Sequence, residues 1–337
     1  MVLVTGGTGL VGSHLILNLL NRGYQVKVLV RKTSNRNLIL KTFSYYSTEA
    51  SELYQRIIWV EGDLLNTISI EDALDGVQQV YHTAACISFN PWLKKKIIET
   101  NVEGTANLVN VCLDKSIEKL CFVSSIAALG LTEDGSEITE NVPWKPTKHE
   151  SAYSFSKFKS EMEVWRGITE GLKAVIVSPS VIFGPGNWKK GSGAIIRNVK
   201  RGVPFYTKGV TGFVDVKDVV ETMIKLMESN IYGERFIVSS ENICYQDLLT
   251  LIAGNLNVKP PQIYLKRWLS GIIWRLASLN SFLFSTSNQI SRAIVEISYK
   301  KLYYSSTKVT GAIDFKFKPV KETLAELVSF FKQDRLN

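Results

Sequence analysis

Histidine and cysteine are scarce in this chain, which has three of the first and four of the second among 337 residues. His14, His82 and His149 lie far apart in the sequence, and the cysteines show no CxxC spacing. A metal site and a disulfide framework are therefore not expected. Three of the four cysteines lie in apolar segments, so we expect buried thiols in a reducing compartment.

Long uninterrupted apolar runs are also missing. The segment from Trp268 to Phe284 is rich in aromatic residues, but Arg275 and several Ser and Asn residues interrupt it. A membrane-spanning helix needs about 20 consecutive apolar residues, so we expect this segment to pack over a substrate pocket, with contact at a membrane surface as the alternative. An apolar strand that starts at Val2 leaves no room for a targeting peptide, and we expect a cytoplasmic protein.

The net positive charge, +9 at pH 7, is dispersed in short runs such as Lys94–Lys96. No nucleic-acid-binding motif accompanies these runs, so we expect no nucleic-acid partner. The surplus of positive charge favours anionic small molecules. The length of the chain and its hydrophobic content of 45% predict a globular protein with one large domain or two unequal ones.

Apolar runs and helical segments alternate along the chain as far as Pro179. The runs typical of strands are Val2–Thr5, Tyr24–Val30, Ile57–Val60, Val80–Thr83, Leu120–Ser124 and Ala174–Ser178. The helical segments are Leu10–Leu20, Ile70–Leu74, Val102–Leu113 and Tyr153–Ile168. This alternation predicts an α/β fold with a doubly wound parallel sheet that is buried on both faces. The segment Asn35–Leu53 shows no clear period and is expected to be a long connection.

A glycine-rich turn connects the first strand to the first helix, with three glycines spaced three residues apart. Glycine is needed where a chain turns tightly, where its backbone approaches a phosphate and where a helix packs closely on a strand. The positive end of the following helix faces the same point. The segment predicted to bind the pyrophosphate of a dinucleotide consists of Gly6, Thr8, Gly9, Leu10, Val11 and Gly12.

The second strand ends at Arg31, with Lys32 beside it. A carboxylate at this place binds the ribose hydroxyls of NAD, whereas a guanidinium suits the 2′-phosphate of NADP through charge-assisted hydrogen bonds. Arg31 therefore favours NADP as the cofactor, with NAD as the alternative. The plainer interpretation is a solvated arginine at the end of a strand.

Tyr153 and Lys157 are four residues apart in a helical segment, so both side chains leave the helix on one face. A nearby ammonium favours the ionised form of a phenol, and lowering the phenol pKa by three units takes about 4 kcal/mol. A lysine and a bound cationic nicotinamide together can supply that amount. Taken alone, the spacing is common on helices.

Seven motifs in one order resemble those of the extended branch of the short-chain dehydrogenase/reductase family. They are TGGTGLVG from Thr5, Gly62–Leu64, His82–Ala85, Asn101–Thr105, Val123–Ser125, Tyr153–Lys157 and Ser178–Gly186. The end of the chain, Ser305–Phe331, is similar to that branch as well. The resemblance implies a Rossmann-type fold and an NAD(P)-dependent oxidoreductase.

The family's functional residues fall on matching positions of this chain. The resemblance implies that Ser125 bonds the substrate oxygen, with Ser124 as the neighbour that could be confused with it. It implies that Tyr153 shuttles the proton and that Lys157 holds the nicotinamide ribose and lowers the Tyr153 pKa. The further cofactor-binding residues that it implies are Asp63 at the adenine, Leu64, Thr83, Ala84 and Ala85 along the channel, Asn101 beside the central helix, and Pro179 and Val181 at the nicotinamide.

After Pro179 the regular alternation gives way to glycine- and proline-rich loops, which predicts a second, smaller domain. We expect residues 1–180, with returning segments near 210–240, to form the NAD(P)-binding Rossmann domain. Residues 181–337 are then mainly the substrate-binding domain. The resemblance also implies a homodimer built on the helices Val102–Leu113 and Tyr153–Ile168.

Two positions narrow the reaction. Dehydratases of this family carry an Asp-Glu pair where this chain has Ile126 and Ala127, so elimination is not expected. Nucleotide-sugar epimerases carry an arginine just before the aromatic residue of the segment Thr211–Val216, where this chain has Gly212. The segment is more similar to dihydroflavonol 4-reductase-like and 3β-hydroxysteroid dehydrogenase-like enzymes. We therefore expect an NADP-preferring reductase of a ketone or aldehyde on a largely apolar small molecule. The alternatives are a nucleotide-sugar epimerase that retains NAD and a non-catalytic NADP-binding sensor.

Overall fold

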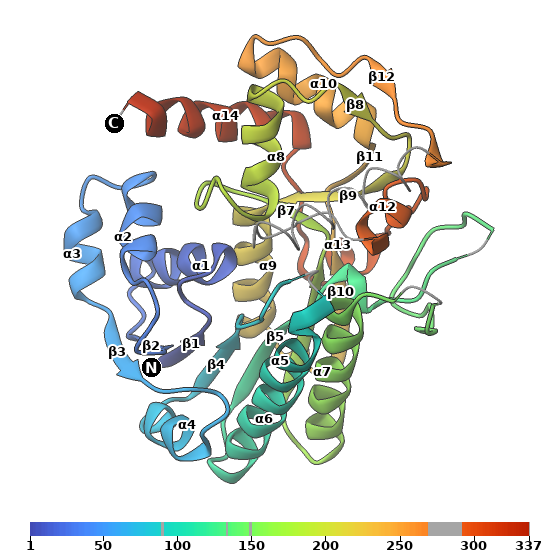
Figure 1. Ribbon diagram of the computed structural model, residues 1–337. Helices are drawn as coiled ribbons and strands as arrows, with labels where there is room; N and C mark the ends of the chain where they lie inside the picture. Colours follow the sequence, from blue (N-terminus) through green and yellow to red (C-terminus); the bar gives the residue numbers. More distant parts are fainter. Residues whose placement is uncertain (89–90, 133, 148–149, 269–291, 337) are drawn as a thin grey trace.

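Seven parallel strands form the central sheet of the computed structural model, which describes residues 1–88, 91–132, 134–147, 150–268 and 292–336 (Figure 1). Their order across the sheet is β10-β6-β5-β4-β1-β2-β3. The strands are β1 (Val2–Thr5), β2 (Val26–Val30), β3 (Ile58–Glu61), β4 (Gln79–His82), β5 (Lys119–Val123), β6 (Ala174–Pro179) and β10 (Glu234–Val238). The chain order reverses between β1 and β4, which is where doubly wound sheets bind their ligands.

Side chains of each strand alternate between two buried layers, as the period of two along a strand requires. On β1, Val2 and Val4 pack in one layer and Leu3 packs in the other. The first layer includes helices α1 (Leu10–Asn21) and α9 (Val216–Glu228), and the second includes α4 (Thr67–Leu74), α6 (Gly104–Asp114) and α7 (Ala152–Thr169). The predicted α/β fold with a doubly wound parallel sheet is confirmed.

The expectation for Asn35–Leu53 is wrong, because this segment contains two helices, α2 (Asn37–Ser44) and α3 (Ala50–Gln55). Ile39 and Phe43, one helical turn apart, are fully buried against the first layer. Each helix is too short for a hydrophobic period to repeat, so the pattern could not reveal them.

The chain leaves the sheet after β6 and builds a third hydrophobic cluster. Its elements are β7 (Val181–Phe183), α8 (Gly191–Lys200), β9 (Val210–Asp215), α10 (Tyr245–Leu256) and α14 (Val320–Leu336), with β11 (Glu241–Cys244) paired to β9. Between these elements α9 returns to pack on α1, and β10 pairs with β6 at the edge of the sheet. In Figure 1, α8, α10 and α14 lie above the sheet.

The remaining elements are short. Strands β8 (Phe205–Tyr206) and β12 (Ile263–Tyr264) form a separate pair, and the helices α12 (Arg292–Ile297) and α13 (Thr307–Ile313) precede α14. Most of the aromatic segment 268–284 lies outside the described residues, so its expected place over a substrate pocket stays a prediction. Within the described residues, no helix is both long enough and apolar enough to cross a membrane.

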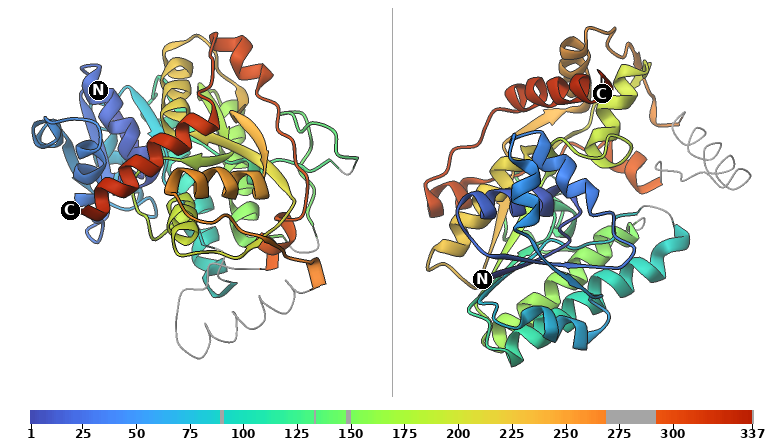
Figure 2. Two further views of the ribbon diagram at one scale, coloured as in Figure 1. Left: turned by 90° about the horizontal axis from the view of Figure 1, so that it is seen from above. Right: turned by 90° about the vertical axis from the view of Figure 1, so that its left-hand side faces the viewer.

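Helix α14 runs from the third cluster to the first helices of the chain, as the two views of Figure 2 show. At its far end, Asp334 accepts hydrogen bonds from Tyr45 (2.8 Å) and Trp188 (2.6 Å) and pairs with Lys41 at 2.5 Å. In the middle of the helix, Glu326 pairs with Lys217 at 2.5 Å. The C-terminal helix is thus tied to α2 and to the start of α9.

Candidate active site at the carboxyl edge of the sheet

The predicted site residues follow the carboxyl ends of six neighbouring strands, which lie at one edge of a parallel sheet. They are Gly6–Gly12 after β1, Arg31 after β2, Asp63 and Leu64 after β3, Thr83–Ala85 after β4, Ser125 after β5, and Pro179 with Val181 at the junction of β6 and β7. Tyr153 and Lys157 come from the first turns of α7 and Asn101 from a π-helical turn before α6. The fold therefore collects these positions from the first 181 residues along this edge.

The glycine turn is packed too closely to accept side chains. A Cβ at Gly6, whose φ is +72°, would lie 2.5 Å from the backbone nitrogen of Ala84. A Cβ at Gly12 would lie 2.4 Å from the Gly6 carbonyl oxygen and 2.8 Å from Oγ1 of Thr83. Gly9 stands at the N-cap of α1, where it brings no side chain to the first N–H groups of the helix.

Asn101 connects the loop after β4 to the helix that carries Tyr153. Its side-chain oxygen accepts a hydrogen bond from the backbone N–H of Cys86 at 2.6 Å, two residues beyond Ala84. Its amide nitrogen donates to the Cys86 carbonyl (3.1 Å) and to the hydroxyl of Ser156 (2.9 Å). Because Asn101 is 3% exposed, these contacts exclude water and hold the β4 loop against α7.

Ser125 and Tyr153 meet at this edge, where their side-chain hydroxyls are hydrogen-bonded. The Ser125 hydroxyl also accepts the backbone N–H of Ala127 at 3.1 Å and caps the 3₁₀ turn Ile126–Ala128. The hydroxyl of Ser124 turns into the interior instead and donates to Glu161 at 2.6 Å. Of the two adjacent serines, Ser125 is therefore the one beside Tyr153.

Lys157 is almost completely buried, with 1% of its surface exposed. Its ammonium donates to the Val123 carbonyl at 2.7 Å and lies 4.2 Å from the centre of the Phe122 ring. Burial lowers the pKa of Lys157 to about 7, while the nearby Glu161 carboxylate raises it.

Burial raises the pKa of Tyr153, and the hydrogen bond with Ser125 opposes that shift. In the protein alone the direction is opposite to the lowering expected from the sequence. That expectation combined the lysine with a bound cationic nicotinamide, whereas desolvation of the phenol sets the direction in the protein alone.

Two arginines lie near the end of β2. Arg31 is exposed directly after the strand. Arg36, at the N-cap of α2, stacks on the ring of Trp59 from β3, with its guanidinium carbon 5.0 Å from the ring centre. Sequence analysis missed Arg36, and its spacing of five from Arg31 gave no signal for it.

The turn after β3 holds Asp63 and Leu64 in different surroundings. The Asp63 carboxylate accepts the backbone N–H of Leu65 at 3.0 Å and leaves its other oxygen for further contacts. Leu64 is 8% exposed and packs against α6. A Cβ added to Gly104 of that helix would lie 3.0 Å from the Cβ of Leu64. Leu64 is thus part of the core beneath the edge.

Sequence analysis also missed Glu161, which is fully buried one helical turn after Lys157. Besides Ser124, its carboxylate accepts hydrogen bonds from the Trp165 ring nitrogen (3.2 Å) and from Arg235 on β10 (2.7 Å). Two signals were available: the spacing of four that continues from Tyr153 and Lys157 to Glu161, and an arginine inside an apolar strand, which requires a buried acceptor.

Two histidines, His14 and His82, are held by hydrogen bonds inside the fold. His82 is held between the hydroxyls of Thr5 (2.7 Å) and Thr105 (3.0 Å), and burial lowers its pKa to about 3. His14 bonds the Leu10 carbonyl at 2.7 Å, and His149 lies outside the described residues. Across the described ranges, no three His, Cys, Asp or Glu side chains gather as a metal site needs.

The profile of the NAD dependent epimerase/dehydratase family matches residues 2–238. This chain belongs to that family. The match begins at β1 and ends with β10, so it covers the whole seven-stranded sheet. The family resemblance noted in the sequence is confirmed, and the protein is an NAD(P)-dependent enzyme of the extended short-chain dehydrogenase/reductase type.

Among curated relatives, the chain is similar to a protein named putative dihydroflavonol 4-reductase from Synechocystis sp. The two are 29% identical over 336 residues, which cover 98% of this chain and 94% of the relative. A cinnamoyl-CoA reductase 1 from Petunia hybrida is 25% identical, with 75% of this chain and 76% of the relative covered. Both names are those of reductases.

Solved structures share the fold over nearly the whole chain. The protein gox2253 is 30% identical, with a TM-score of 0.82 and coverage of 99% of this chain and 98% of the other. The UDP-glucose 4-epimerase of Thermus thermophilus, in complex with NAD, is 22% identical, with a TM-score of 0.74 and 98% of each chain covered. The second likeness is one of fold.

Proposed function

We propose that this protein is an NADP-preferring reductase of a ketone or aldehyde on a largely apolar small molecule, with Tyr153 as the proton donor. The observation that carries the proposal is the hydroxyl pair of Ser125 and Tyr153, together with the buried ammonium of Lys157, which is bonded to the Val123 carbonyl two residues before Ser125. The relatives named as reductases, of which one matches 98% of this chain, support the same class of reaction.

The residues at the glycine turn fit a dinucleotide. Gly6 and Gly12 let the turn pack backbone against backbone, where a Cβ would collide with Ala84 and with the Gly6 carbonyl oxygen. The helix α1 begins there with uncapped N–H groups, which suits a pyrophosphate. The residues assigned to the rest of the cofactor are Asp63, Thr83, Ala84, Ala85, Pro179 and Val181. At the adenosine end, the exposed guanidinium of Arg31 favours a 2′-phosphate, and Arg36 adds a second positive charge.

The site residues divide the work of carbonyl reduction between them. When bound, the reduced nicotinamide supplies a hydride to the carbonyl carbon. Ser125 donates a hydrogen bond to the carbonyl oxygen and stabilises the negative charge that grows there. Tyr153 transfers its hydroxyl proton to that oxygen. Lys157 bonds the nicotinamide ribose, and its positive charge stabilises the tyrosinate that remains.

An apolar substrate is supported by β9. A Cβ at Gly212, which precedes Phe213, would lie 2.3 Å from the Ser239 hydroxyl oxygen. An arginine that grips a nucleotide diphosphate therefore has no space at this position. We assign the cofactor to residues 1–180 with returning segments near 210–240, and the substrate mainly to residues 181–337.

A screen of purified protein for absorbance loss at 340 nm tests this proposal. NADPH and NADH are each offered with ketones, aldehydes and nucleotide sugars, and the nucleotide released on denaturation is identified. We expect carbonyl-dependent oxidation of NADPH that is faster than that of NADH. Stoichiometric bound NAD together with no NADPH consumption on any carbonyl compound contradicts the proposal.

One observation favours a nucleotide-sugar epimerase as the second candidate. The Nε atom of Arg197 on α8 is buried and has no hydrogen-bond partner within the described residues, and an anionic group of a bound substrate would supply that partner. An epimerase retains NAD through its cycle. Equilibration of a UDP-hexose with its 4-epimer, without added cofactor, identifies this function.

The proposed assembly is a homodimer through α6 and α7. These helices pack side by side, and Arg166 donates to Asn110 across them at 2.7 Å. Light scattering at micromolar concentration is expected to give twice the chain mass of 37.8 kDa. A monomeric mass contradicts it.

A further inference from the structure

Three consecutive residues at the end of β5 are each held by a residue of α7. The three contacts are Val123 with Lys157 (2.7 Å), Ser124 with Glu161 (2.6 Å) and Ser125 with Tyr153. The three helix residues are four apart, so they form one stripe along α7. The two outer contacts belong to the residues of the proposed chemistry, and the Glu161 contact has no assigned role.

Glu161 is the last residue of this stripe, and it bonds to a residue from the C-terminal part of the chain. Its partner Arg235 lies on β10, the strand that returns to the sheet after the chain has entered the third hydrophobic cluster. Arg235 also donates to the backbone carbonyl of Glu140, whose carboxylate accepts the backbone N–H of Ile237 at 2.8 Å. Because the Glu161 side chain is fully buried, this network is not exchanged for water.

We propose that Glu161 is a positioning residue for the reaction, which holds Ser124 on one side and Arg235 on the other and thereby fixes Ser125 and Lys157 against Tyr153. This inference rests on the proposed reductase function. A carboxylate suits the task because it accepts several hydrogen bonds at once, and those from charged donors are the strongest.

Glu161 also sets the charge around Lys157. The other titratable groups that face this lysine are Tyr153 on its own helix and His82 from β4, which burial keeps neutral at pH 7. Arg235, from β10, is neutralised by Glu161 itself. Removing the carboxylate therefore leaves no negative charge among these groups, and the pKa of Lys157 falls below its value of about 7.

The test uses the variant Glu161→Gln, which keeps the size of the side chain and removes its charge. The matched control is Glu163→Gln on the same helix. Glu163 pairs at 3.0 Å with Arg166, and both side chains are partly exposed. Four quantities are measured: kcat and KM for a carbonyl substrate, the dissociation constant for NADPH, and the pH titration of Lys157. The last is followed by NMR of ¹³Cε-lysine protein, with the signal assigned from Lys157→Met.

We expect Glu161→Gln to lower kcat at least about tenfold, with KM for the carbonyl substrate changed less than about threefold. The Lys157 titration and the alkaline limb of the kcat profile both move to lower pH. Glu163→Gln leaves all of these unchanged. If Glu161→Gln does not fold, Ser124→Ala and Arg235→Lys are measured instead. We expect a smaller loss of kcat in each of them. In Arg235→Lys we also expect the Lys157 titration to stay close to that of the wild type.

Two results overturn the inference. The first is a wild-type kcat and a wild-type Lys157 titration in Glu161→Gln, or in both substitute variants. The second is a loss of activity that disappears when rates are expressed per folded molecule. The Lys157 titration needs no turnover, so it separates this inference from the reductase proposal. A shifted titration in a protein that reduces no carbonyl compound leaves the positioning role intact and removes the proposed reaction.

Discussion

The side-chain hydroxyls of Ser125 and Tyr153 are hydrogen-bonded to each other at the carboxyl edge of the sheet. Ser125 follows β5 and Tyr153 lies in the first turn of α7, so the pair exists only because the strand and the helix are held in register. A substrate oxygen that lies between the two hydroxyls accepts a hydrogen bond from each residue, in place of the one that they share. A carbonyl oxygen has the lone pairs to accept both.

Tyr153→Phe removes the proposed proton donor and little volume. We expect kcat to fall by about 10²–10⁴-fold, the usual contribution of a general acid, while the NADPH dissociation constant stays within about twofold. Steady-state rate assays measure kcat, and fluorescence titration measures the NADPH dissociation constant. Tyr232→Phe, at a side chain that is 56% exposed, is the control. If Tyr153→Phe binds NADPH as the wild type does, and the wild type shows no turnover, the protein is the non-catalytic sensor.

Lys157→Met is expected to abolish activity and to stabilise the fold by about 1–2 kcal/mol, because a desolvated ammonium is replaced by an apolar chain of similar length. The folded-state pKa of about 7 lies below the ordinary value of 10.5, so the penalty for the charged form is complete below pH 7. It disappears as the pH approaches 10.5. Urea unfolding at pH 6 and pH 10 checks this, since the gain is larger at pH 6.

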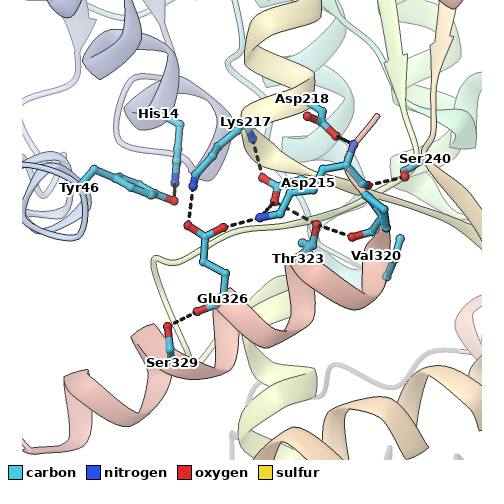
Figure 3. A network of polar contacts seen from close by, with 12 residues as sticks. His14, Tyr46, Asp215, Lys217, Asp218, Ser240, Val320, Thr323, Glu326 and Ser329 are labelled. Atoms are coloured by element: carbon cyan, nitrogen blue, oxygen red, sulfur yellow. Dashed lines mark hydrogen bonds and ion pairs between the residues drawn. The ribbon is translucent and has the colours of Figure 1, made fainter. Parts of the chain in front are cut away.

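Asp218→Asn is expected to stabilise the protein at neutral pH. Burial raises the pKa of Asp218 to about 6, above its ordinary value, so ionisation destabilises the fold as the pH rises from about 4 to about 7. The site is partly exposed, and we expect a gain of about 1–2 kcal/mol at pH 7.5 and none at pH 4. Asparagine retains an acceptor for the backbone N–H of Lys318, which lies 2.8 Å from the Asp218 carboxylate. Figure 3 shows Asp218 in the polar network around Asp215. Equal effects at both pH values contradict this assignment.

Arg31→Ala tests the choice between NADP and NAD. Loss of a charge-assisted contact to a 2′-phosphate is expected to weaken NADPH binding about tenfold to a hundredfold and to leave NADH binding within about twofold. Lys115→Ala, at the opposite edge of the sheet before β5, removes the same charge as a control. Equal losses for the two cofactors in Arg31→Ala leave the preference without support.

Local patterns were enough to predict the sheet, the glycine turn and the Tyr153–Lys157 pair, whereas most of the other positions along the edge came from the family resemblance. The glycine spacing, the apolar strands and the pair Tyr153 and Lys157 each lie within a few residues, where short-range sterics and helix geometry apply. The contact of Asn101 with Ser156 joins residues 55 apart, and that of Glu161 with Arg235 joins residues 74 apart. Such partners depend on which strands become neighbours, and the family resemblance supplied the first of these residues but not the second pair.

The pKa of Tyr153 could not be predicted in the same way. The helix spacing placed an ammonium nearby, but the burial of the phenol depends on tertiary packing, which helix spacing does not encode. Desolvation then decides the direction of the shift. Charged neighbours are therefore easier to infer from sequence than burial is. A pKa inferred from sequence is wrong in direction where burial decides the shift.

Gly12→Ala separates the role of a glycine in a helix from its role in the turn. In an exposed helix interior, alanine is more stabilising than glycine by about 0.5–1 kcal/mol. Gly254→Ala in α10, where a Cβ meets nothing within 4 Å, is expected to show that gain. At Gly12 the added methyl would lie 2.4 Å from the Gly6 carbonyl oxygen, so the turn must open. We expect a loss of about 1–3 kcal/mol and weaker NADPH binding, measured by thermal unfolding and fluorescence titration. A stabilised Gly12→Ala protein that binds NADPH normally means that the backbone at this point does not approach the pyrophosphate.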